Sequence, residues 1–170
     1  MEEKKLYFIY NPHSGREQIR AKLFHILQIF SDAGYELTVH PTREKKDAVR
    51  QIEMLSDDYD LVVCSGGDGT IDEVVEGMMR RDRKFPIGYI PSGTVNDFAR
   101  SLKIPRDMLK AAKIAVEGKD FPCDMGTFNE GHFVYIAAFG IFTDVAYSTS
   151  QNVKNVLGHM AYLLEGVKRL

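Results

Sequence analysis

A glycine-rich pentad, Gly66-Gly67-Asp68-Gly69-Thr70, is the part of this sequence with the clearest chemical character. It follows an apolar run and precedes an amphipathic one, so it should join a strand to a helix. Glycines in such a turn let backbone N–H groups approach an anion, and the helix N-terminus adds partial positive charge. The Asp68 carboxylate would repel phosphate unless a divalent cation or a proton donor lies between them. The pentad therefore predicts chemistry on a nucleotide; the structural alternative is a tight turn in which Asp68 caps the following helix.

Two other polar turns also follow apolar runs. Residues 11–15 read Asn-Pro-His-Ser-Gly, and residues 91–100 read Pro-Ser-Gly-Thr-Val-Asn-Asp-Phe-Ala-Arg. Each offers N–H groups and hydroxyls to a phosphate, and each has a structural alternative as a helix cap or as a first-turn helix acid. Asp124 opens a later strand-like run and on its own would be a surface residue. Beside Asp68 and Asp97 it could complete a carboxylate cluster that holds hydrated Mg²⁺.

Strand-like and helix-like runs alternate from residue 5 to residue 116. The strands are expected at 5–10, 35–40, 59–64 and 86–90, and the helices at 19–30, 47–55, 71–79, 95–102 and 108–116. Strands that are apolar on both faces and alternate with helices predict an α/β fold, a parallel sheet with helices on both faces. Such sheets bind ligands at the carboxyl ends of their strands, so the three polar turns should gather on one edge.

The pattern changes near residue 119. Two strands are expected at 121–128 and 133–139, joined by a turn at 129–131, and a helix is expected at 153–170. We therefore divide the chain into an α/β domain at 1–118 and the opening of an incomplete, antiparallel β-rich domain at 119–170. Uncovered aromatic side chains in that second unit predict a homodimer or poor behaviour in solution.

Composition narrows the classes of partner. A net charge of −2 over 170 residues gives no reason to expect nucleic acid. The short basic runs at 43–46 and 80–84 are best read as solvated helix faces, with an anionic surface such as a membrane as the alternative. Cys64 and Cys123 lack the spacing of a metal site, and Cys64 should be a buried, inert thiol. With no signal peptide and no apolar run long enough to cross a bilayer, a cytoplasmic protein with at most peripheral membrane contact is expected.

Taken in order, the three motifs Asn-Pro-x-Ser-Gly, Gly-Gly-Asp-Gly-Thr and Pro-x-Gly-Thr-x-Asn-Asp-Phe resemble the diacylglycerol kinase catalytic family, especially the bacterial soluble diacylglycerol kinases and YegS-like lipid kinases. The resemblance implies an ATP- and Mg²⁺-dependent lipid kinase that transfers the γ-phosphoryl group to the hydroxyl of diacylglycerol or a similar lipid at the membrane surface. It implies nucleotide contacts from Asn11, Pro12, His13, Ser14, Gly15, Thr42, Gly67, Asp68, Gly69, Thr70, Ile71, Asp72, Glu73 and Thr94. It also implies that Asp68, Asp97 and Asp124 organise Mg²⁺ through water, with Asp68 as the catalytic residue.

Two departures from the family pattern limit what can be carried over. Asp72 stands where the family usually has Asn, and a carboxylate cannot donate the hydrogen bond that an amide can. The chain is also about half as long as family members, whose catalytic base and structural metal ligands lie in the absent part. We therefore assign no base, expect this chain alone to be inactive, and cannot name the lipid from the sequence. Two alternatives remain: a kinase of NAD or of a soluble alcohol, and a non-catalytic nucleotide-binding module.

Overall fold

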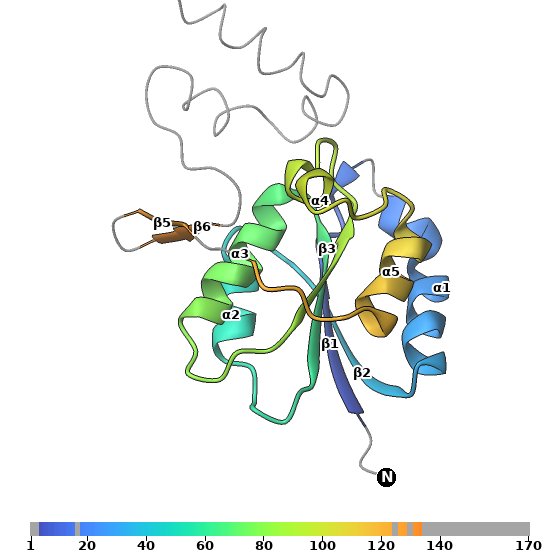
Figure 1. Cartoon of the computed structure of the whole chain (residues 1–170), viewed down its shortest axis with the longest axis horizontal. Coiled ribbons are helices and arrows are strands. Elements are labelled where there is room, and N and C mark those ends of the chain that lie inside the picture. The colour runs from blue at the N-terminus through green and yellow to red at the C-terminus, as the bar shows by residue number, and fades with distance from the viewer. Residues whose placement is uncertain (1–3, 16–17, 124–125, 129–130, 134–170) are drawn as a thin grey trace, which may run out of the picture.

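The structure is a computed structural model that describes residues 4–15, 18–123, 126–128 and 131–133. Its main body is a four-stranded parallel sheet with the strand order β2-β1-β3-β4 (Figure 1). The strands are β1 (Lys4–Tyr10), β2 (Tyr35–Pro41), β3 (Leu61–Gly66) and β4 (Ile87–Pro91). The helices are α1 (Gln18–Asp32), α2 (Asp47–Glu53), α3 (Asp68–Met79), α4 (Asp97–Ser101) and α5 (Met108–Glu117).

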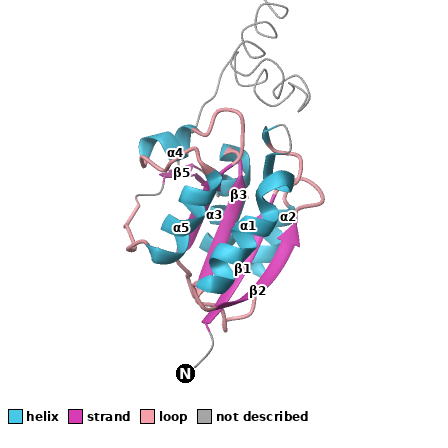
Figure 2. Cartoon of the chain, turned by 90° about the vertical axis from the view of Figure 1, so that its right-hand side faces the viewer, coloured by secondary structure: helices cyan, strands magenta, loops and turns pink. Residues whose placement is uncertain are grey.

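Helices cover both faces of this sheet, as the alternating sequence pattern predicts. Helices α1 and α5 pack side by side on one face, and α2 and α3 pack together on the other (Figures 1 and 2). The side chains of β1 alternate between the two layers: Leu6 and Phe8 join the α1/α5 core, whereas Tyr7 and Ile9 join the α2/α3 core. This period of two is what a strand buried on both faces requires. The predicted α/β fold is confirmed.

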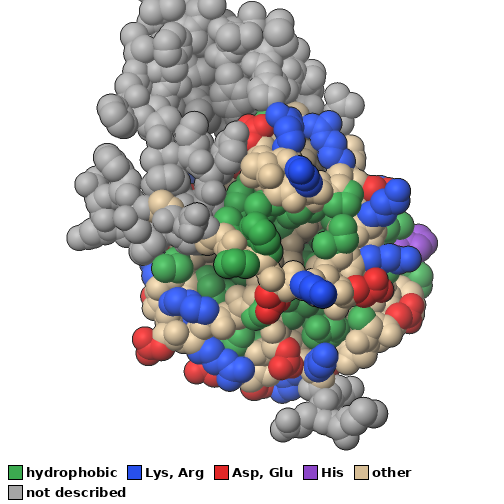
Figure 3. Space-filling model, in the orientation of Figure 1, with side chains coloured by type: hydrophobic (Ala, Val, Ile, Leu, Met, Phe, Trp, Pro, Cys, Tyr) green, Lys and Arg blue, Asp and Glu red, His purple; other side chains and the backbone are tan. Residues whose placement is uncertain are grey.

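The register of the sheet brings the strand ends to one level. Tyr10 at the end of β1 is paired with Pro41 of β2 and with Ser65 of β3, and Gly66 is paired with Pro91 of β4. The segments that follow these four strands therefore start from the same edge. Helix α4 lies at this end of the molecule, where Lys and Arg side chains gather (Figure 3).

Two local predictions need correction. The pentad is not a separate turn, because Gly66 ends β3 and Asp68 already begins α3, which leaves Gly67 as the sole connecting residue. In the second unit an antiparallel hairpin of β5 (Gly126–Phe128) and β6 (Gly131–Phe133) is present, and Gly131, which was predicted in the turn, begins β6. The described residues 121–123 form no strand. Pro122 among them has no N–H to donate to a neighbouring strand.

The remaining predictions on the second unit, the strand beyond residue 133 and the helix at 153–170, lie outside the described residues. Cys64 is fully buried as predicted, and burial raises the pKa of its thiol, which suits an unreactive core side chain. Among the described helices, each one is too short or too polar to cross a lipid bilayer.

Candidate functional site

A pocket of about 470 Å³ opens at the carboxyl edge of the sheet. Four segments, each following a different strand, supply its walls. They contribute Asn11, His13 and Ser14 after β1, residues 42–45 after β2, residues 67–70 and Glu73 at the start of α3, and residues 93–95 after β4. The three polar turns singled out in the sequence therefore meet at one site, together with a fourth segment of which the sequence analysis had assigned only Thr42 to it.

Close contact between two glycines joins the pentad to the segment after β4. A Cβ atom on Gly93 would lie 2.4 Å from the Cα atom of Gly67, so a residue larger than glycine does not fit here unless the backbone moves. The carbonyl oxygen of Gly66 accepts hydrogen bonds from the N–H of Ser92 at 2.9 Å and from the hydroxyl of Tyr89 at 3.1 Å. These contacts fix the start of α3 against the end of β4.

Gly69 differs from these packed glycines. A Cβ atom built on Gly69 would have no atom of the described residues within 4 Å beyond its chain neighbours and the backbone of its own helix, although the residue lines the pocket. Packing within the described part of the chain therefore does not require a glycine at this position. Open space beside backbone N–H groups in the first turn of a helix is what the approach of an anion requires.

The Asp68 carboxylate is engaged with the main chain of α4. Its two oxygens accept hydrogen bonds from the N–H groups of Asp97, at 3.1 Å, and of Phe98, at 3.0 Å. Asp68 thus caps α4, a helix 29 residues further along the chain, rather than its own helix as the structural alternative supposed. The bond also brings Asp97, whose carboxylate pairs with Arg100 at 3.1 Å, next to the pentad.

The predicted magnesium set is only partly visible. Asp68 and Asp97 are neighbours, whereas Asp124 lies outside the described residues. Within the described ranges no three His, Cys, Asp or Glu side chains come together as a metal-binding group. Because the Asp68 oxygens already accept N–H groups, the pair is better suited to hold water around a cation than to surround the cation directly. The assignment of all three acids stays a prediction.

A chain of buried hydroxyls ties the first turn to the segment after β4. Ser65 donates to Ser92 at 3.2 Å, the Ser92 and Ser14 oxygens lie 2.7 Å apart, and Ser14 donates to the carbonyl oxygen of Asn11 at 3.1 Å. Since each hydroxyl has one proton, Ser92 must donate to Ser14. Gly15 has a φ of +47°, and a Cβ atom there would lie 1.9 Å from the Ser92 carbonyl oxygen. The turn at residues 11–15 therefore needs a glycine at its end.

The segment after β2 contains the site residues that the sequence analysis missed. Arg43, Glu44 and Lys45 line the pocket with Thr42, whereas basic residues of this run were interpreted as a solvated helix face. They precede α2, which begins at Asp47. The rule that placed the other turns at the carboxyl edge applies equally to residues that follow β2, so this signal was present in the sequence.

The other predicted nucleotide-contacting residues divide into two groups. The pocket is lined by Asn11, His13, Ser14, Thr42, Gly67, Asp68, Gly69, Thr70, Glu73 and Thr94. It is not lined by Pro12, Gly15, Ile71 or Asp72. Ile71 is only 1% exposed and packs in the α2/α3 core, so it offers almost no surface to a ligand. Nucleotide binding by any of these residues stays a prediction.

Comparisons with known proteins point to one family. Residues 5–128 match the family model described as diacylglycerol kinase catalytic domain. The chain is 43% identical over 169 residues to the diacylglycerol kinase of Bacillus subtilis (strain 168), which covers 98% of the chain and 56% of that protein. It is 39% identical over 168 residues to the diacylglycerol kinase of Staphylococcus carnosus (strain TM300), which covers 98% of the chain and 55% of that protein.

A solved structure leads to the same family. The crystal structure of a diacylglycerol kinase from Bacillus anthracis str. Sterne has a TM-score of 0.71 and 30% sequence identity to this chain, over 78% of this chain and 46% of that one. The chain spans about half the length of the curated relatives it matches. The matched family model spans most of this chain, including all the strands of its parallel sheet and the pocket at their ends, and the chain belongs to the diacylglycerol kinase catalytic domain family.

Proposed function

We propose that this chain is the nucleotide-binding half of an ATP- and Mg²⁺-dependent lipid kinase that phosphorylates the hydroxyl of diacylglycerol or a similar lipid. Family membership supports the kinase class. The observation that carries the nucleotide assignment is the open space beside Gly69, in the wall of a pocket where the segments after four parallel strands converge. Phosphoryl transfer depends mainly on positioning and charge neutralisation, and both are properties that such a pocket provides.

The residues present suit a polyphosphate. In α3, a helix of 12 residues, the N–H groups of Thr70 and Ile71 already donate to the carbonyl oxygen of Gly67, whereas those of Asp68 and Gly69 come before these bonds and are available to an anion. The hydroxyl-bearing residues Thr42, Thr70 and Thr94 and the cationic residues Arg43 and Lys45 line the same space. Glycines at 67 and 69 let a phosphate reach the main chain.

The acidic pair would serve the metal. Asp68 and Asp97 would hold water molecules of a hydrated Mg²⁺ ion, which keeps much of its water shell in proteins. Bound there, the ion would neutralise charge on the phosphates. In this proposal Asp68 has two roles, because its carboxylate also fixes the start of α4 and so sets the position of Asp97.

Nucleotide binding can be tested on the chain itself. Calorimetric titration with ATP should show binding that Mg²⁺ strengthens. Binding that is indifferent to Mg²⁺ would favour a non-catalytic nucleotide-binding module, and absence of binding would contradict the proposal.

The kinase reaction needs a protein of full family length that carries this domain. It should transfer phosphate from labelled ATP to diacylglycerol in vesicles, sediment with those vesicles as a peripheral protein, and leave NAD unmodified. Asp68→Asn should lower turnover by at least about 100-fold while the circular dichroism spectrum is retained. The matched control is Asp107→Asn, because Asp107 also caps a helix, α5, but lies outside the pocket. Phosphorylation of NAD but not of lipid would overturn the lipid assignment. Normal turnover by the Asp68→Asn variant would overturn the metal assignment.

A further inference from the structure

We propose that Asp47 is a positioning residue that holds residues Thr42–Lys46, here called the Thr42–Lys46 loop, as a preformed cationic wall for the phosphates of the ligand. This inference rests on the proposed nucleotide-binding function. Asp47 does not itself line the pocket, so any effect it has on binding must pass through the residues that it holds.

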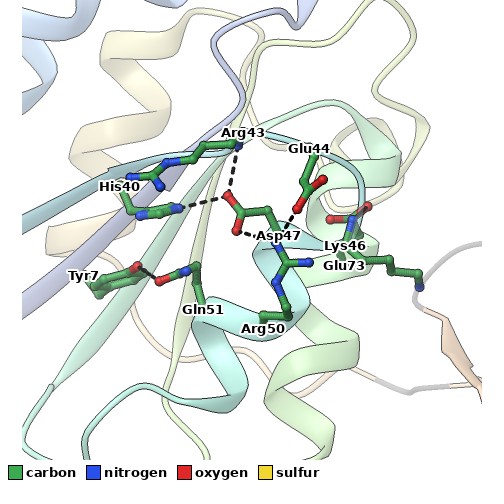
Figure 4. A network of polar contacts seen from close by, with 9 residues as sticks. All are labelled: Tyr7, His40, Arg43, Glu44, Lys46, Asp47, Arg50, Gln51 and Glu73. Atoms are coloured by element: carbon green, nitrogen blue, oxygen red, sulfur yellow. Dashed lines mark hydrogen bonds and ion pairs between the residues drawn. The ribbon is translucent and has the colours of Figure 1, made fainter.

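The Asp47 carboxylate is buried, and its partners lie in the loop or beside it (Figure 4). Its Oδ2 atom accepts the N–H of Arg43 at 2.9 Å and lies 3.1 Å from Nε2 of His40. Its Oδ1 atom accepts from Arg50 at 3.2 Å. One side chain thus ties the last residues of β2, the start of the loop and the first turns of α2 together. A buried carboxylate is costly unless it is paired in this way.

Other bonds fix the remaining parts of the loop. The N–H of Thr42 donates to the carbonyl oxygen of Tyr10 at 2.8 Å, and the N–H of Lys46 donates to Glu73 at 2.9 Å. Glu73 belongs to α3, the helix that the pentad begins. Lys46 has a φ of +65°, a left-handed conformation that costs about 1 kcal/mol or more for a non-glycine residue. A loop that keeps such a conformation is held there by its surroundings.

The charged side chains of the loop have different surroundings. Glu44 pairs with Arg50 at 2.8 Å, and the same guanidinium donates to Asp47, so the Glu44 carboxylate is held within the network (Figure 4). Arg43 and Lys45 contribute positive charge to the pocket lining. A loop already fixed in place loses little conformational entropy when an anion binds, whereas a free loop would have to be ordered at that moment. Asp47 would therefore strengthen binding in proportion to the phosphate charge of the ligand.

The carboxylate stays ionised at neutral pH. Burial disfavours the charged form, but hydrogen bonds from His40, from the Arg43 N–H and from Arg50 outweigh it and hold the pKa of Asp47 below its ordinary value. The contacts to Asp47 drawn in Figure 4 are therefore made to an ionised carboxylate under physiological conditions.

The test is calorimetric titration of Asp47→Asn with ATP, inorganic tripolyphosphate and adenosine. ATP and tripolyphosphate should each bind about 10-fold more weakly than to the unchanged chain, which corresponds to about 1.4 kcal/mol, while the affinity for adenosine changes less than about 2-fold. The matched control is Asp60→Asn. Asp60 accepts the N–H of Lys5 at 2.7 Å, so the chemical change is the same, but it lies before β3, at the opposite edge of the sheet. All three affinities should survive in the control.

A second pair of variants shows whether Asp47 acts through the loop. Arg43→Gln combined with Lys45→Gln should weaken tripolyphosphate binding, and adding Asp47→Asn should cause no further loss. If Asp47→Asn fails to fold, the Arg43→Gln/Lys45→Gln double variant alone still tests whether the loop binds phosphate, because the side chains of Arg43 and Lys45 are exposed and can be replaced without loss of packing.

The outcomes separate the two proposals. Unchanged ATP and tripolyphosphate affinity in Asp47→Asn, or in the double variant, overturns the positioning role and leaves the nucleotide function intact. Equal losses for adenosine and ATP indicate general damage to the pocket and also overturn it. An unchanged chain that binds neither ATP nor tripolyphosphate overturns the proposed function and this inference together.

Discussion

Polar side chains form hydrogen bonds at both ends of the parallel sheet, but the segments that they hold have different surroundings. At the carboxyl end, Asp68 holds the start of α4, Ser92 holds the first turn, and Asp47 holds the Thr42–Lys46 loop. All three sets of bonds surround an open pocket. The polar groups there therefore hold segments that border this open space.

At the amino end, the polar groups bond to one another within the protein. The Arg81 side chain, 5% exposed, donates to the carbonyl oxygens of Ile52 and Leu55, pairs with Asp57, and lies 4.9 Å from the ring centroid of Phe85. These contacts join the segments that lead into β3 and β4. A buried guanidinium that satisfies several carbonyl groups serves stability.

The difference teaches how to separate residues that stabilise this fold from residues that prepare it for a ligand. Burial and hydrogen bonding do not distinguish them, because Asp47 and Arg81 are both buried and bonded. What distinguishes them is whether the group that they hold borders open space. Substitutions at the amino end should therefore change the free energy of unfolding alone, and substitutions around the pocket should change ligand affinity.

The largest expected effect belongs to Arg81→Met. Removal of the guanidinium leaves buried carbonyl oxygens without donors, which should lower the free energy of unfolding by about 2–4 kcal/mol. Urea denaturation followed by circular dichroism measures this change. Arg80→Met is the control, because the Arg80 side chain is 48% exposed and its ion pairs with Glu53 and Glu76 should contribute less than about 1 kcal/mol.

The same variant can break the comparison. The folded fraction of Arg81→Met should bind ATP within about 2-fold of the unchanged chain. A large loss of affinity at constant folded fraction would mean that the amino end also prepares the pocket.

Gly69→Ala tests the carboxyl end with a smaller change. Apart from its chain neighbours and the backbone of its own helix, no atom of the described residues is close enough to oppose the new methyl group. Alanine is also the better helix former by up to about 1 kcal/mol, so stability should be unchanged or slightly higher. The methyl group would occupy the space through which a phosphate reaches the first turn of α3. ATP affinity should therefore fall about 10-fold or more, as measured by calorimetry. Unchanged affinity, or a clear loss of stability, would remove the main support for a phosphate site at Gly69.

The sequence was sufficient for the features that depend on local pattern. Alternating strands and helices predicted the parallel sheet, and the strand-end rule brought the turns at residues 11–15, 66–70 and 91–97 to one edge. It was not sufficient for features that depend on distances between remote residues. The bond from Asp68 to α4 spans 29 positions, and nothing local distinguishes it from a cap on α3.

The Thr42–Lys46 loop shows a second kind of limit. Lys and Arg side chains in a short run look the same whether they face solvent on a helix or line a pocket before one begins. The predicted helix at 47–55 does begin at Asp47, so the helix start is not what was missed. What the sequence pattern does not contain is the hydrogen bond from the Arg43 N–H to the Asp47 carboxylate, which fixes these residues beside the pocket.

The smallest expected effect is a change in how stability depends on pH, and it concerns Asp58 at the amino end. At the amino end, hydrogen bonds from Lys5 and Ser56 lower the pKa of Asp58 from 3.8 to about 2. Because the folded-state pKa is the lower one, ionised Asp58 stabilises the fold above the ordinary pKa, and this stabilisation is lost as the pH falls from near 3.8 towards 2. Asp58→Asn should flatten that part of a plot of urea midpoint against pH.

The same aspartate should leave the pocket alone. Since Asp58 and Lys5 are both substantially exposed, salt should screen their pairing and make the flattening harder to detect at high ionic strength. At neutral pH, Asp58→Asn should bind ATP as the unchanged chain does, whereas Asp47→Asn, which removes another carboxylate with a lowered pKa, should not. Two acids with the same direction of pKa shift would then differ in function, because only Asp47 holds a segment that lines the pocket. Equal effects of Asp58→Asn and Asp47→Asn on ATP affinity would refute that distinction.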